Sequence, residues 1–325
     1  MKVVVTGATG GLGRAIIENL STKKDLQLVA LGRNQKIGRE LEALRVKFLP
    51  GSITDTTYLK SAFTGADVVI HCAGLATPGA HKQRYEEVNI KGTQSVLSAL
   101  AGRAEIKLIS LSTPSIYFSG LPRTDIKESD PLPKSYKYHY PRTKLCADKL
   151  IIDQRPRNSI LLRPRAIIGK YDRTILPKIL KLMRKGYFLL PDAGSAKVDF
   201  TATQNVVHAI WLIMSSKKSF YGDIYNVTNN EPIPLQELME LIQKKFGLRV
   251  KYISIPKSLL LSLAQLCEVI APLFGSSEPF LTRYGVHSIG TTQTLSTKKI
   301  QEELGYTPVI SLEDALSKLA KNQRG

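Results

Sequence analysis

The fold of this chain is decided by its opening stretch, Met1-Lys2-Val3-Val4-Val5-Thr6-Gly7-Ala8-Thr9-Gly10-Gly11-Leu12-Gly13-Arg14. An apolar run rich in β-branched residues stops at a glycine-rich turn, and a periodic apolar stretch from Ala15 to Leu20 follows at once. This order predicts a strand, a glycine turn and a helix, which together open a βαβ unit.

The spacing of the glycines indicates what the turn is for. Gly7 can take the tight turn, Gly10 removes a side chain where backbone approaches a pyrophosphate, and Gly13 lets the helix lie close to its strand. The helix N-terminus then offers free N–H groups and a partial positive charge to phosphates. We therefore expect a dinucleotide site whose phosphate cradle is made by Gly7, Thr9, Gly10, Gly11, Leu12 and Gly13.

Composition narrows the class of protein. The chain has 325 residues, which is long enough to bury a full core. Its charged fraction of 22% is typical of a globular protein. The strand at its start leaves no room for a signal peptide, and three widely spaced cysteines argue against disulfides or a metal site, so we expect a cytoplasmic protein. The net charge of +19 is spread without a long basic tract, which favours an anionic substrate or membrane surface over nucleic acid.

Short apolar strands alternate with helical stretches in the first half of the chain. We expect further strands at 26–31, 46–49, 67–71 and 106–111, and helices at 35–44, 56–63, 84–100 and 138–153. This alternation predicts an α/β fold with a Rossmann-type, doubly wound parallel sheet. After Gly169 the alternation of strands and helices becomes less regular. We therefore expect a dinucleotide-binding domain at 1–168 plus about 199–228, and a smaller substrate lobe at about 169–198 plus 229–325.

The residues that follow the second and fourth strands indicate which cofactor binds and where it lies. An acidic residue at the second tip would bind the adenosine ribose, whereas an arginine suits a 2′-phosphate. Arg33 stands there without an acid, which favours NADP over NAD, unless Arg33 is a plain solvated cation. Cys72, Ala73 and Gly74 are small enough to let a cofactor lie across the strand ends, and His71 before them is interpreted as a packed structural histidine.

A catalytic set is predicted where the fifth strand ends. Thr113 follows that strand, and Tyr140 and Lys144 share a face of the next helix because they are four residues apart. A lysine ammonium and an oxidised nicotinamide would both lower the pKa of Tyr140. Tyr140 could then exchange a proton with an alcohol or carbonyl during hydride transfer, with Thr113 holding the substrate oxygen and Lys144 anchoring the cofactor ribose.

Together these motifs resemble the extended short-chain dehydrogenase/reductase (NAD-dependent epimerase/dehydratase) family. The matching stretches are Thr6–Gly13, Asp67–Gly74, Val88–Thr93, Ser112-Thr113, Tyr140–Lys144 and Leu162–Gly169. The resemblance implies Thr113, Tyr140 and Lys144 as the catalytic set. It also implies cofactor contacts from Asn89, from Pro164 and Ile167 beside the nicotinamide, and from Ser52 and Ile53 beside the adenine. Ser52 departs from the family, which usually carries an aspartate there.

Within that family the chain is most similar to the 3β-hydroxysteroid dehydrogenase and sterol-4-carboxylate 3-dehydrogenase branch, through Ser112–Ser115, Thr77–Gly79 and Leu281–Tyr284. The resemblance implies an NADP-dependent oxidoreductase that interconverts a secondary alcohol and a ketone on a hydrophobic, sterol-like or long-chain 3-hydroxy or 3-oxo substrate. Leu304–Pro308 is shared with nucleotide-sugar epimerases, so an epimerase or reductase of that kind stays an alternative. A non-catalytic NADP-sensing regulator is a further alternative, and a homodimer is left open.

One apolar segment, Ser258–Phe274, stands apart from the rest of the second half. It is too short for a comfortable membrane span and carries Gln265, Glu268 and Pro272. We interpret it as an ordinary lobe helix, with a lid or a helix resting on a membrane surface as the alternative. The net charge of +19 would suit contact with anionic lipid.

Overall fold

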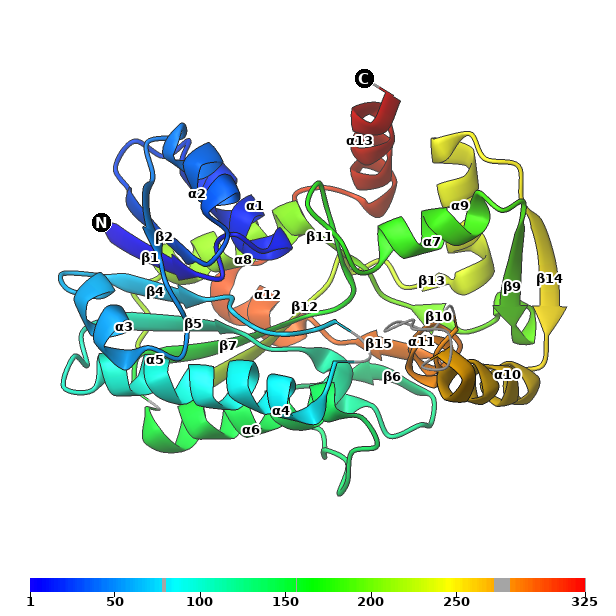
Figure 1. The fold of residues 1–325 in the computed structure, drawn as a ribbon, viewed down its shortest axis with the longest axis horizontal. Helices are drawn as coiled ribbons and strands as arrows, with labels where there is room; N and C mark the ends of the chain where they lie inside the picture. The colour runs from blue at the N-terminus through cyan, green and yellow to red at the C-terminus, as the bar shows by residue number, and fades with distance from the viewer. Residues whose placement is uncertain (78–79, 156, 272–280, 325) are drawn as a thin grey trace.

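A seven-stranded parallel sheet lies at the centre of the larger part of the molecule (Figure 1). The structure is a computed structural model that describes all residues except 78–79, 156, 272–280 and 325. The strand order is β12-β7-β5-β4-β1-β2-β3, and each neighbouring pair is parallel. In chain order the strands are β1 (Lys2–Thr6), β2 (Gln27–Gly32), β3 (Lys47–Pro50), β4 (Val68–His71), β5 (Lys107–Leu111), β7 (Ser159–Pro164) and β12 (Asp223–Val227).

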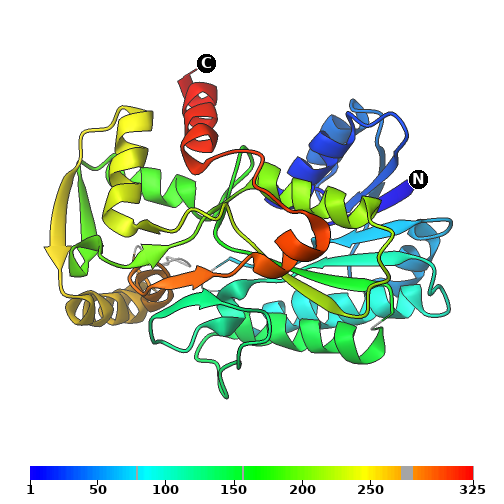
Figure 2. The same cartoon turned by 180° about the vertical axis from the view of Figure 1, so that it is seen from behind.

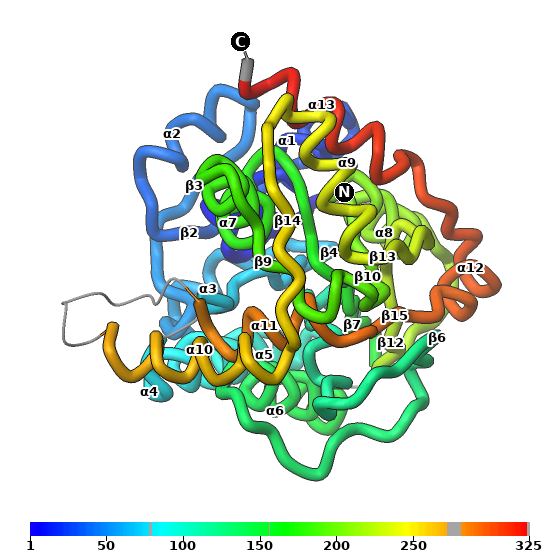
Figure 3. Tube along the Cα trace, turned by 90° about the vertical axis from the view of Figure 1, so that its right-hand side faces the viewer, coloured from blue at the N-terminus to red at the C-terminus, as the bar shows by residue number. Residues whose placement is uncertain are grey.

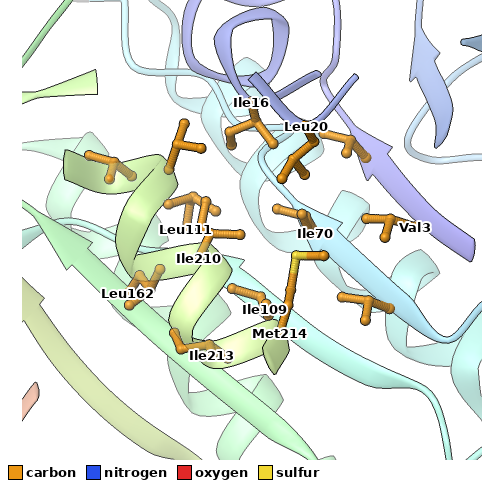
Figure 4. Packing of buried hydrophobic residues seen from close by; sticks show 14 of the residues in the cluster. Val3, Ile16, Leu20, Ile70, Ile109, Leu111, Leu162, Ile210, Ile213 and Met214 are labelled. Carbon is orange, nitrogen blue, oxygen red and sulfur yellow. The ribbon is translucent and has the colours of Figure 1, made fainter. Parts of the chain in front are cut away.

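Helices cover both faces of this sheet, because successive strand residues point to opposite sides. Val3 and Val5 pack beneath one set of helices and Val4 beneath the other. The first set is α1 (Gly11–Leu20), α2 (Gln35–Glu42) and α8 (Thr203–Ser215), and Figure 4 shows Ile16 of α1 and Ile210 of α8 over the strands. The second set is α3 (Thr56–Ala62), α5 (Gly92–Leu100) and α6 (His139–Gln154). The prediction of a Rossmann-type, doubly wound sheet is confirmed.

The predicted helix at 84–100 is the element that differs most from expectation. It consists of α4 (Lys82–Tyr85), a π-helical turn η1 (Glu86–Lys91) and α5. Such wide turns are uncommon and often occur at functional sites. Here the turn contains Asn89, a residue that the family resemblance had singled out and whose side chain is buried. The other predicted helix and strand limits agree with the structure to within a few residues.

Smaller sheets and helices lie beside the main sheet (Figures 1 and 2). A four-stranded sheet has the order β13-β10-β15-β6, and two pairs are β11-β8 and β14-β9. The strands are β6 (Arg123–Ile126), β8 (Ile167–Ile168), β9 (Tyr187–Pro191), β10 (Lys197–Val198), β11 (Thr201–Ala202), β13 (Ile233–Pro234), β14 (Lys251–Ile255) and β15 (Gln293–Leu295). Their helices are α7 (Leu176–Met183), α9 (Leu235–Phe246), α10 (Lys257–Ile270), α11 (Arg283–Ile289), α12 (Lys298–Leu304), α13 (Leu312–Arg324) and the short 3₁₀ turns η2 (Pro114–Tyr117) and η3 (Asp192–Gly194).

A separate apolar core joins α7, β9, β10, α9 and α13. The four-stranded sheet also includes β6, which precedes Tyr140 in the chain, so this part of the molecule is assembled from both halves of the sequence. Its strands are short, and nothing in the sequence pattern had indicated β6 or β15. The exact division into a dinucleotide-binding domain and a substrate lobe stays a prediction.

Helix α10 contains the described part of the segment Ser258–Phe274, whose last three residues lie outside the described part of the chain. The helix lies at the edge of the molecule in Figures 1 and 3. It buries Leu260 and Ala264, but it exposes Leu259, Leu263, Leu266 and Val269. Within the described residues, no helix combines the length and apolarity needed to cross a membrane.

Candidate active site

The glycine turn after β1 meets the loop after β4 at the point where the strand order reverses. Gly7 has φ +67, and a Cβ there would lie 2.7 Å from Cα of Ala73. A Cβ on Gly13 would lie 2.3 Å from the Gly7 carbonyl oxygen. Both positions therefore require glycine, and the two loops meet where ligands bind in open α/β sheets.

The first turn of α1 leaves its N–H groups available to a ligand. Gly10 is the N-cap, and because it has no side chain no side-chain oxygen caps the helix. The Gly10 N–H itself donates to the Gly7 carbonyl at 2.9 Å, which closes the turn. No acidic residue lies in the first turn, so neither a cap nor a negative charge opposes a pyrophosphate placed at Gly11 and Leu12. This arrangement fits a dinucleotide.

The second strand tip lies beside this cradle. A Cβ on Gly32 would lie 2.6 Å from Thr9 Oγ1, so the turn and the tip are in contact. Arg33 follows, is exposed, and forms no hydrogen bond or ion pair within the described part of the chain. The neighbouring Asn34 caps α2 by accepting from the Ile37 N–H at 3.1 Å. Arg33 is therefore available to a phosphate at this position.

The predicted adenine contacts differ in exposure. Ser52 is exposed, and its hydroxyl pairs with that of Thr54 at 2.9 Å. Ile53 is partly buried, and a Cβ on Gly92 of α5 would lie 3.0 Å from Ile53 Cγ2. Ser52 and Ile53 lie after β3, two strands from β1, and their contact with a cofactor stays a prediction.

The loop of Cys72, Ala73 and Gly74 after β4 is held in place by Asn89. Asn89 Oδ1 accepts from the Leu75 N–H at 2.8 Å, and its Nδ2 donates to the Leu75 carbonyl at 3.2 Å and to Thr143 Oγ1 at 3.1 Å. The polar atoms of Asn89 are thus used within the protein. We expect Asn89 to act on a cofactor by positioning this loop rather than by direct contact.

His71 is a structural residue, as the sequence suggested. Its two ring nitrogens hydrogen-bond the hydroxyls of Thr6 at 2.9 Å and Thr93 at 3.1 Å. Burial, with a contribution from the nearby Lys144 charge, lowers the pKa of His71 to about 3. The imidazole is therefore neutral at physiological pH and joins β1, β4 and α5.

Thr113, Tyr140 and Lys144 come together at the carboxyl end of β5. The Thr113 hydroxyl lies close enough to Tyr140 to lower the pKa of its phenol. Lys144 is buried, and its Nζ donates to the Leu111 carbonyl at 2.7 Å. Tyr140 is the second residue of α6 and Lys144 lies one turn later, so the spacing places both side chains toward the same strand end.

The expected low pKa of Tyr140 is not found in the protein alone. Burial raises the pKa of Tyr140, the neighbouring Tyr284 adds to that rise, and the polar hydroxyl of Thr113 opposes it. Burial also lowers the pKa of Lys144, although the Asp148 carboxylate raises it. Without a cofactor, burial is the largest influence on the pKa of Tyr140, and Lys144 Nζ is engaged by the Leu111 carbonyl. The lowered pKa, which was expected with an oxidised nicotinamide bound, stays a prediction.

A buried polar network underlies this site. Asp148 Oδ2 accepts from the Ser112 hydroxyl at 2.6 Å and from Arg163 Nη2 at 3.3 Å. Arg163 Nη1 donates to the Tyr117 hydroxyl at 2.6 Å, which in turn donates to Asn226 Oδ1 at 3.0 Å. The network ties α6, β5, β7 and β12 together, and it holds the helix that carries Tyr140.

Sequence reasoning gave no chemical role to Ser115, Tyr284 or Arg165. The Thr113 hydroxyl donates to Ser115 Oγ at 3.1 Å, and Ser115 Oγ pairs with the Tyr284 hydroxyl at 3.1 Å. Tyr284 lies on α11, far along the chain, so no local pattern could place it here. Its stretch, Leu281–Tyr284, had contributed only to the family resemblance.

The segment after β7 turns sharply at this site. Pro164 ends β7, and Ile167 pairs with Thr201 in the β8–β11 pair. Between them Ala166 has φ +39, which is uncommon for a residue with a side chain. Arg165 Nη1 donates to Gln293 Oε1, and Gln293 Nε2 donates to the Pro114 carbonyl at 3.3 Å. Arg165 therefore connects this turn to the loop that carries Thr113.

Comparisons with known proteins show which family has this sequence pattern. Residues 4–257 match the model of the 3-beta hydroxysteroid dehydrogenase/isomerase family. The chain is 32% identical to the uncharacterised protein YbjS of Escherichia coli (strain K12), over 98% of this chain and 97% of that protein. It is 30% identical to 3beta-hydroxysteroid-dehydrogenase/decarboxylase isoform 1 of Arabidopsis thaliana, over 97% of this chain and 78% of that protein.

Solved structures show the same fold. The UDP-glucuronic acid 4-epimerase of Bacillus cereus, in complex with NAD, superposes with a TM-score of 0.78 over 100% of both chains, at 21% identity. The family match covers the glycine turn, the β4 loop and the Thr113, Tyr140 and Lys144 positions. The chain thus belongs to the 3-beta hydroxysteroid dehydrogenase/isomerase family and is an NAD(P)-dependent dehydrogenase/reductase of the extended short-chain type.

Proposed function

We propose that this chain is an NADP-dependent oxidoreductase that interconverts a secondary alcohol and a ketone on a hydrophobic substrate, either sterol-like or a long-chain 3-hydroxy or 3-oxo compound. One observation carries the proposal: the Thr113 hydroxyl lies close to Tyr140 at the same sheet edge as the glycine cradle, and Lys144 Nζ is held there by the Leu111 carbonyl at the end of β5. A proton donor, an oxygen-binding hydroxyl and a dinucleotide cradle are the parts that such a reaction requires.

Each residue of the set has a distinct task in this proposal. When bound, a nicotinamide cofactor supplies or accepts the hydride. Tyr140 exchanges its hydroxyl proton with the substrate oxygen, and Thr113 hydrogen-bonds the same oxygen. Because burial raises the pKa of Tyr140, the phenol holds its proton at neutral pH and can donate it to a ketone. Removing that proton for alcohol oxidation requires a positive charge nearby, and Lys144 supplies one.

The preference for NADP rests on Arg33. This side chain follows the β2 tip, is exposed, and has no partner within the described residues. The carboxylate that would bind an unphosphorylated ribose is missing from the tip, where Gly32, Arg33 and Asn34 stand in sequence. A guanidinium is the side chain best suited to a 2′-phosphate.

Contact with a lipid surface is part of the same proposal. Leu259, Leu263, Leu266 and Val269 are exposed on α10 at roughly helical spacing. The chain carries a net charge of +19, which would attract it to anionic lipid. A helix at the edge of the molecule that exposes apolar side chains could rest on a bilayer and receive a hydrophobic substrate from it.

The test is nicotinamide absorbance with purified protein and NADP. One panel contains 3β-hydroxysteroids and long-chain 3-hydroxy acids, and the other contains UDP- and TDP-sugars. Reduction of NADP with a lipid alcohol supports the proposal, whereas conversion of sugar nucleotides alone would move the protein to the epimerase or reductase alternative.

Tyr140→Phe is the matched variant, because it removes only the hydroxyl. We expect it to lose turnover by at least about a hundredfold, the scale of general acid–base catalysis, and to bind NADP almost unchanged. Turnover retained in Tyr140→Phe would refute the assignment. Tight NADPH binding without turnover of either panel by the natural protein would favour a cofactor-sensing role.

A further inference from the structure

Three hydroxyl groups form a chain that leads from the active site toward α11. The Thr113 hydroxyl donates to Ser115 Oγ at 3.1 Å, and Ser115 Oγ pairs with the Tyr284 hydroxyl at 3.1 Å. A hydroxyl donates one hydrogen bond and accepts others at the same time, so linked hydroxyls can pass a proton along without moving far. At the other end of the chain, Thr113 lies close enough to Tyr140 to lower its pKa. The chain therefore begins at the phenol that is proposed to exchange a proton with the substrate.

The Tyr284 end of the chain lies at a small cavity of about 10 Å³. Ser115, Tyr284 and His287 are among the residues that line it. This volume is close to the minimum that holds one water molecule, so the cavity suits a water and no larger ligand. A buried water requires two to four polar partners, and the Tyr284 hydroxyl and the His287 ring provide two of them.

His287 lies between this cavity and solvent. It follows Tyr284 by three residues on α11, so the two side chains share a face of the helix. Its Nδ1 is buried and has no hydrogen-bond partner among the described residues, whereas the residue as a whole is partly exposed. Buried polar atoms are normally hydrogen-bonded, and a water in the cavity would satisfy this nitrogen. A neutral imidazole can take a proton at one ring nitrogen and release one at the other.

The charges around His287 prevent it from holding an extra proton. Burial first, and then the charges of Lys257, Lys137 and Arg283, lower the pKa of His287. These cations come from different parts of the chain, and Lys257 Nζ is held nearby by a hydrogen bond to Thr291 Oγ1 at 3.0 Å. A group that transfers protons has to release each one that it takes, so a neutral imidazole among cations suits transfer.

We propose that Thr113, Ser115, Tyr284, one water molecule in the cavity and His287 form a path that carries protons between Tyr140 and solvent. The inference rests on the proposed function, because a hydrophobic substrate that covers Tyr140 keeps bulk water from its hydroxyl. Every turnover nevertheless takes up or releases one proton, and that proton then travels through the protein. Ser115, Tyr284 and His287 act through Thr113 and Tyr140, so they are positioning residues of this path.

The protons balance in both directions of the reaction. As the carbonyl carbon of a ketone accepts the hydride, Tyr140 gives its proton to the carbonyl oxygen and becomes a phenolate. The phenolate takes the proton of Thr113, which takes that of Ser115, which takes that of Tyr284. The water gives a proton to Tyr284 and regains one from His287 Nδ1, and His287 takes one from solvent at Nε2.

Alcohol oxidation runs the same steps in reverse and releases one proton to solvent. In the structure the Thr113 hydroxyl donates toward Ser115, which is the orientation that carries a proton away from Tyr140. Rotation of the hydroxyls about their C–O bonds restores the starting orientation after each transfer.

Ser115→Ala, Tyr284→Phe and His287→Ala each interrupt the path at a different point. Alanine at position 115 keeps the backbone N–H that donates to Thr113 Oγ1 at 3.2 Å, so the Thr113 turn is preserved. We expect each variant to lower kcat by about tenfold, which is less than the loss of about a hundredfold expected for Tyr140→Phe. KM and NADP affinity should hardly change, and the solvent isotope effect on kcat should rise because proton transfer becomes slower. An unchanged kcat and isotope effect in all three variants would overturn the proposal.

Imidazole added to the assay tests the role of His287 directly. His287→Ala removes the ring at a partly exposed position, where free imidazole can enter and carry the proton instead. Imidazole should restore most of the lost kcat in His287→Ala. It should have no effect on Ser115→Ala or Tyr284→Phe, in which the path is broken nearer to Tyr140. A His287→Ala variant that imidazole does not rescue would overturn the assignment of His287 as the end of the path.

A crystal structure separates this inference from the proposed function, because it requires no turnover. It should show an ordered water within about 3.2 Å of both the Tyr284 hydroxyl and His287 Nδ1. A crystal structure that resolves ordered waters but shows none there would overturn the path and leave the oxidoreductase proposal intact. Failure of every alcohol and ketone to react would overturn the proposed function, and the path with it.

Two variants control for structural damage. Tyr136→Phe removes a tyrosine hydroxyl outside the chain, which donates to the Ile116 carbonyl at 2.7 Å. His208→Ala removes a partly exposed histidine on α8, whose ring centroid lies 6.0 Å from that of Tyr306. Both should keep kcat and the solvent isotope effect of the natural protein, and neither should respond to imidazole. Equal losses in Tyr136→Phe and Tyr284→Phe would overturn the proposal, since they would show that the loss is structural.

Discussion

The ion pair between Asp148 and Arg163 gives the sharpest test of what holds the active-site helix. The two side chains are 2% and 3% exposed, and Arg163 Nη2 lies 3.3 Å from Asp148 Oδ2. Asp148→Asn keeps the shape of the side chain and an acceptor for Ser112, but it leaves the Arg163 charge buried without a counter-ion. Arg163→Met leaves the Asp148 carboxylate in the same position.

The magnitude follows from burial. Breaking a buried pair by removing one partner costs about 3–5 kcal/mol, whereas replacing both charges by uncharged groups is often nearly neutral. We therefore expect each single variant to lower the free energy of unfolding by about 3 kcal/mol. The double variant should lose clearly less than the sum of the two single losses, since no uncompensated charge remains. The coupling energy between the two sites should then be about 2–3 kcal/mol.

Urea unfolding followed by circular dichroism measures all four proteins, and the double-mutant cycle isolates the pair. The surface pair Lys298–Glu302, with side chains 74% and 64% exposed, is the matched control and should show a coupling below about 1 kcal/mol. Strictly additive losses at Asp148 and Arg163 would refute the reasoning, because they would mean that neither charge depends on the other.

Three further changes test other parts of the structure. Arg33→Asp should shift the kcat/KM ratio from NADP toward NAD by about ten- to a hundredfold, and an unchanged ratio would show that Arg33 is only a surface cation. Gly13→Ala should weaken calorimetric NADP binding and cost about 1–3 kcal/mol in urea unfolding, because its Cβ would lie 2.3 Å from the Gly7 carbonyl oxygen. Burial raises the pKa of Asp199 from 3.8 to about 6, so its contribution to stability is present below pH 3.8 and is lost as pH rises through 6. Asp199→Asn should flatten that dependence in unfolding curves recorded from pH 4 to 8 and gain up to about 3 kcal/mol at pH 8, whereas an unaltered slope would contradict the shift.

The sheet and the cradle could be predicted because their signals are local. The run Val3-Val4-Val5 followed by spaced glycines fixes a strand and a turn within a few residues, and φ +67 at Gly7 bears this out. The four-residue spacing of Tyr140 and Lys144 likewise places both on one side of α6. Parallel pairing of the strands then follows from the alternation of strands and helices.

The remaining features depend on contacts between distant residues. The π-helical turn at Asn89 and the small sheet that joins β6 to β15 have no period that a sequence window can detect. The raised pKa of Tyr140 depends on burial, and the burial of a side chain cannot be read from its residue type or its neighbours in sequence.

By itself the sequence determined the Rossmann-type sheet, the dinucleotide cradle and the positions of Thr113, Tyr140 and Lys144, since strand, turn and helix preferences act over a few neighbouring residues. Only the tertiary structure decided that Arg165 has no carboxylate in contact among the described residues, and that Tyr284, more than a hundred residues further along the chain, reaches the Thr113 loop through Ser115. The physical reason is that charge compensation and side-chain proximity are properties of the packed molecule, and the same residues in another packing would carry another chemistry.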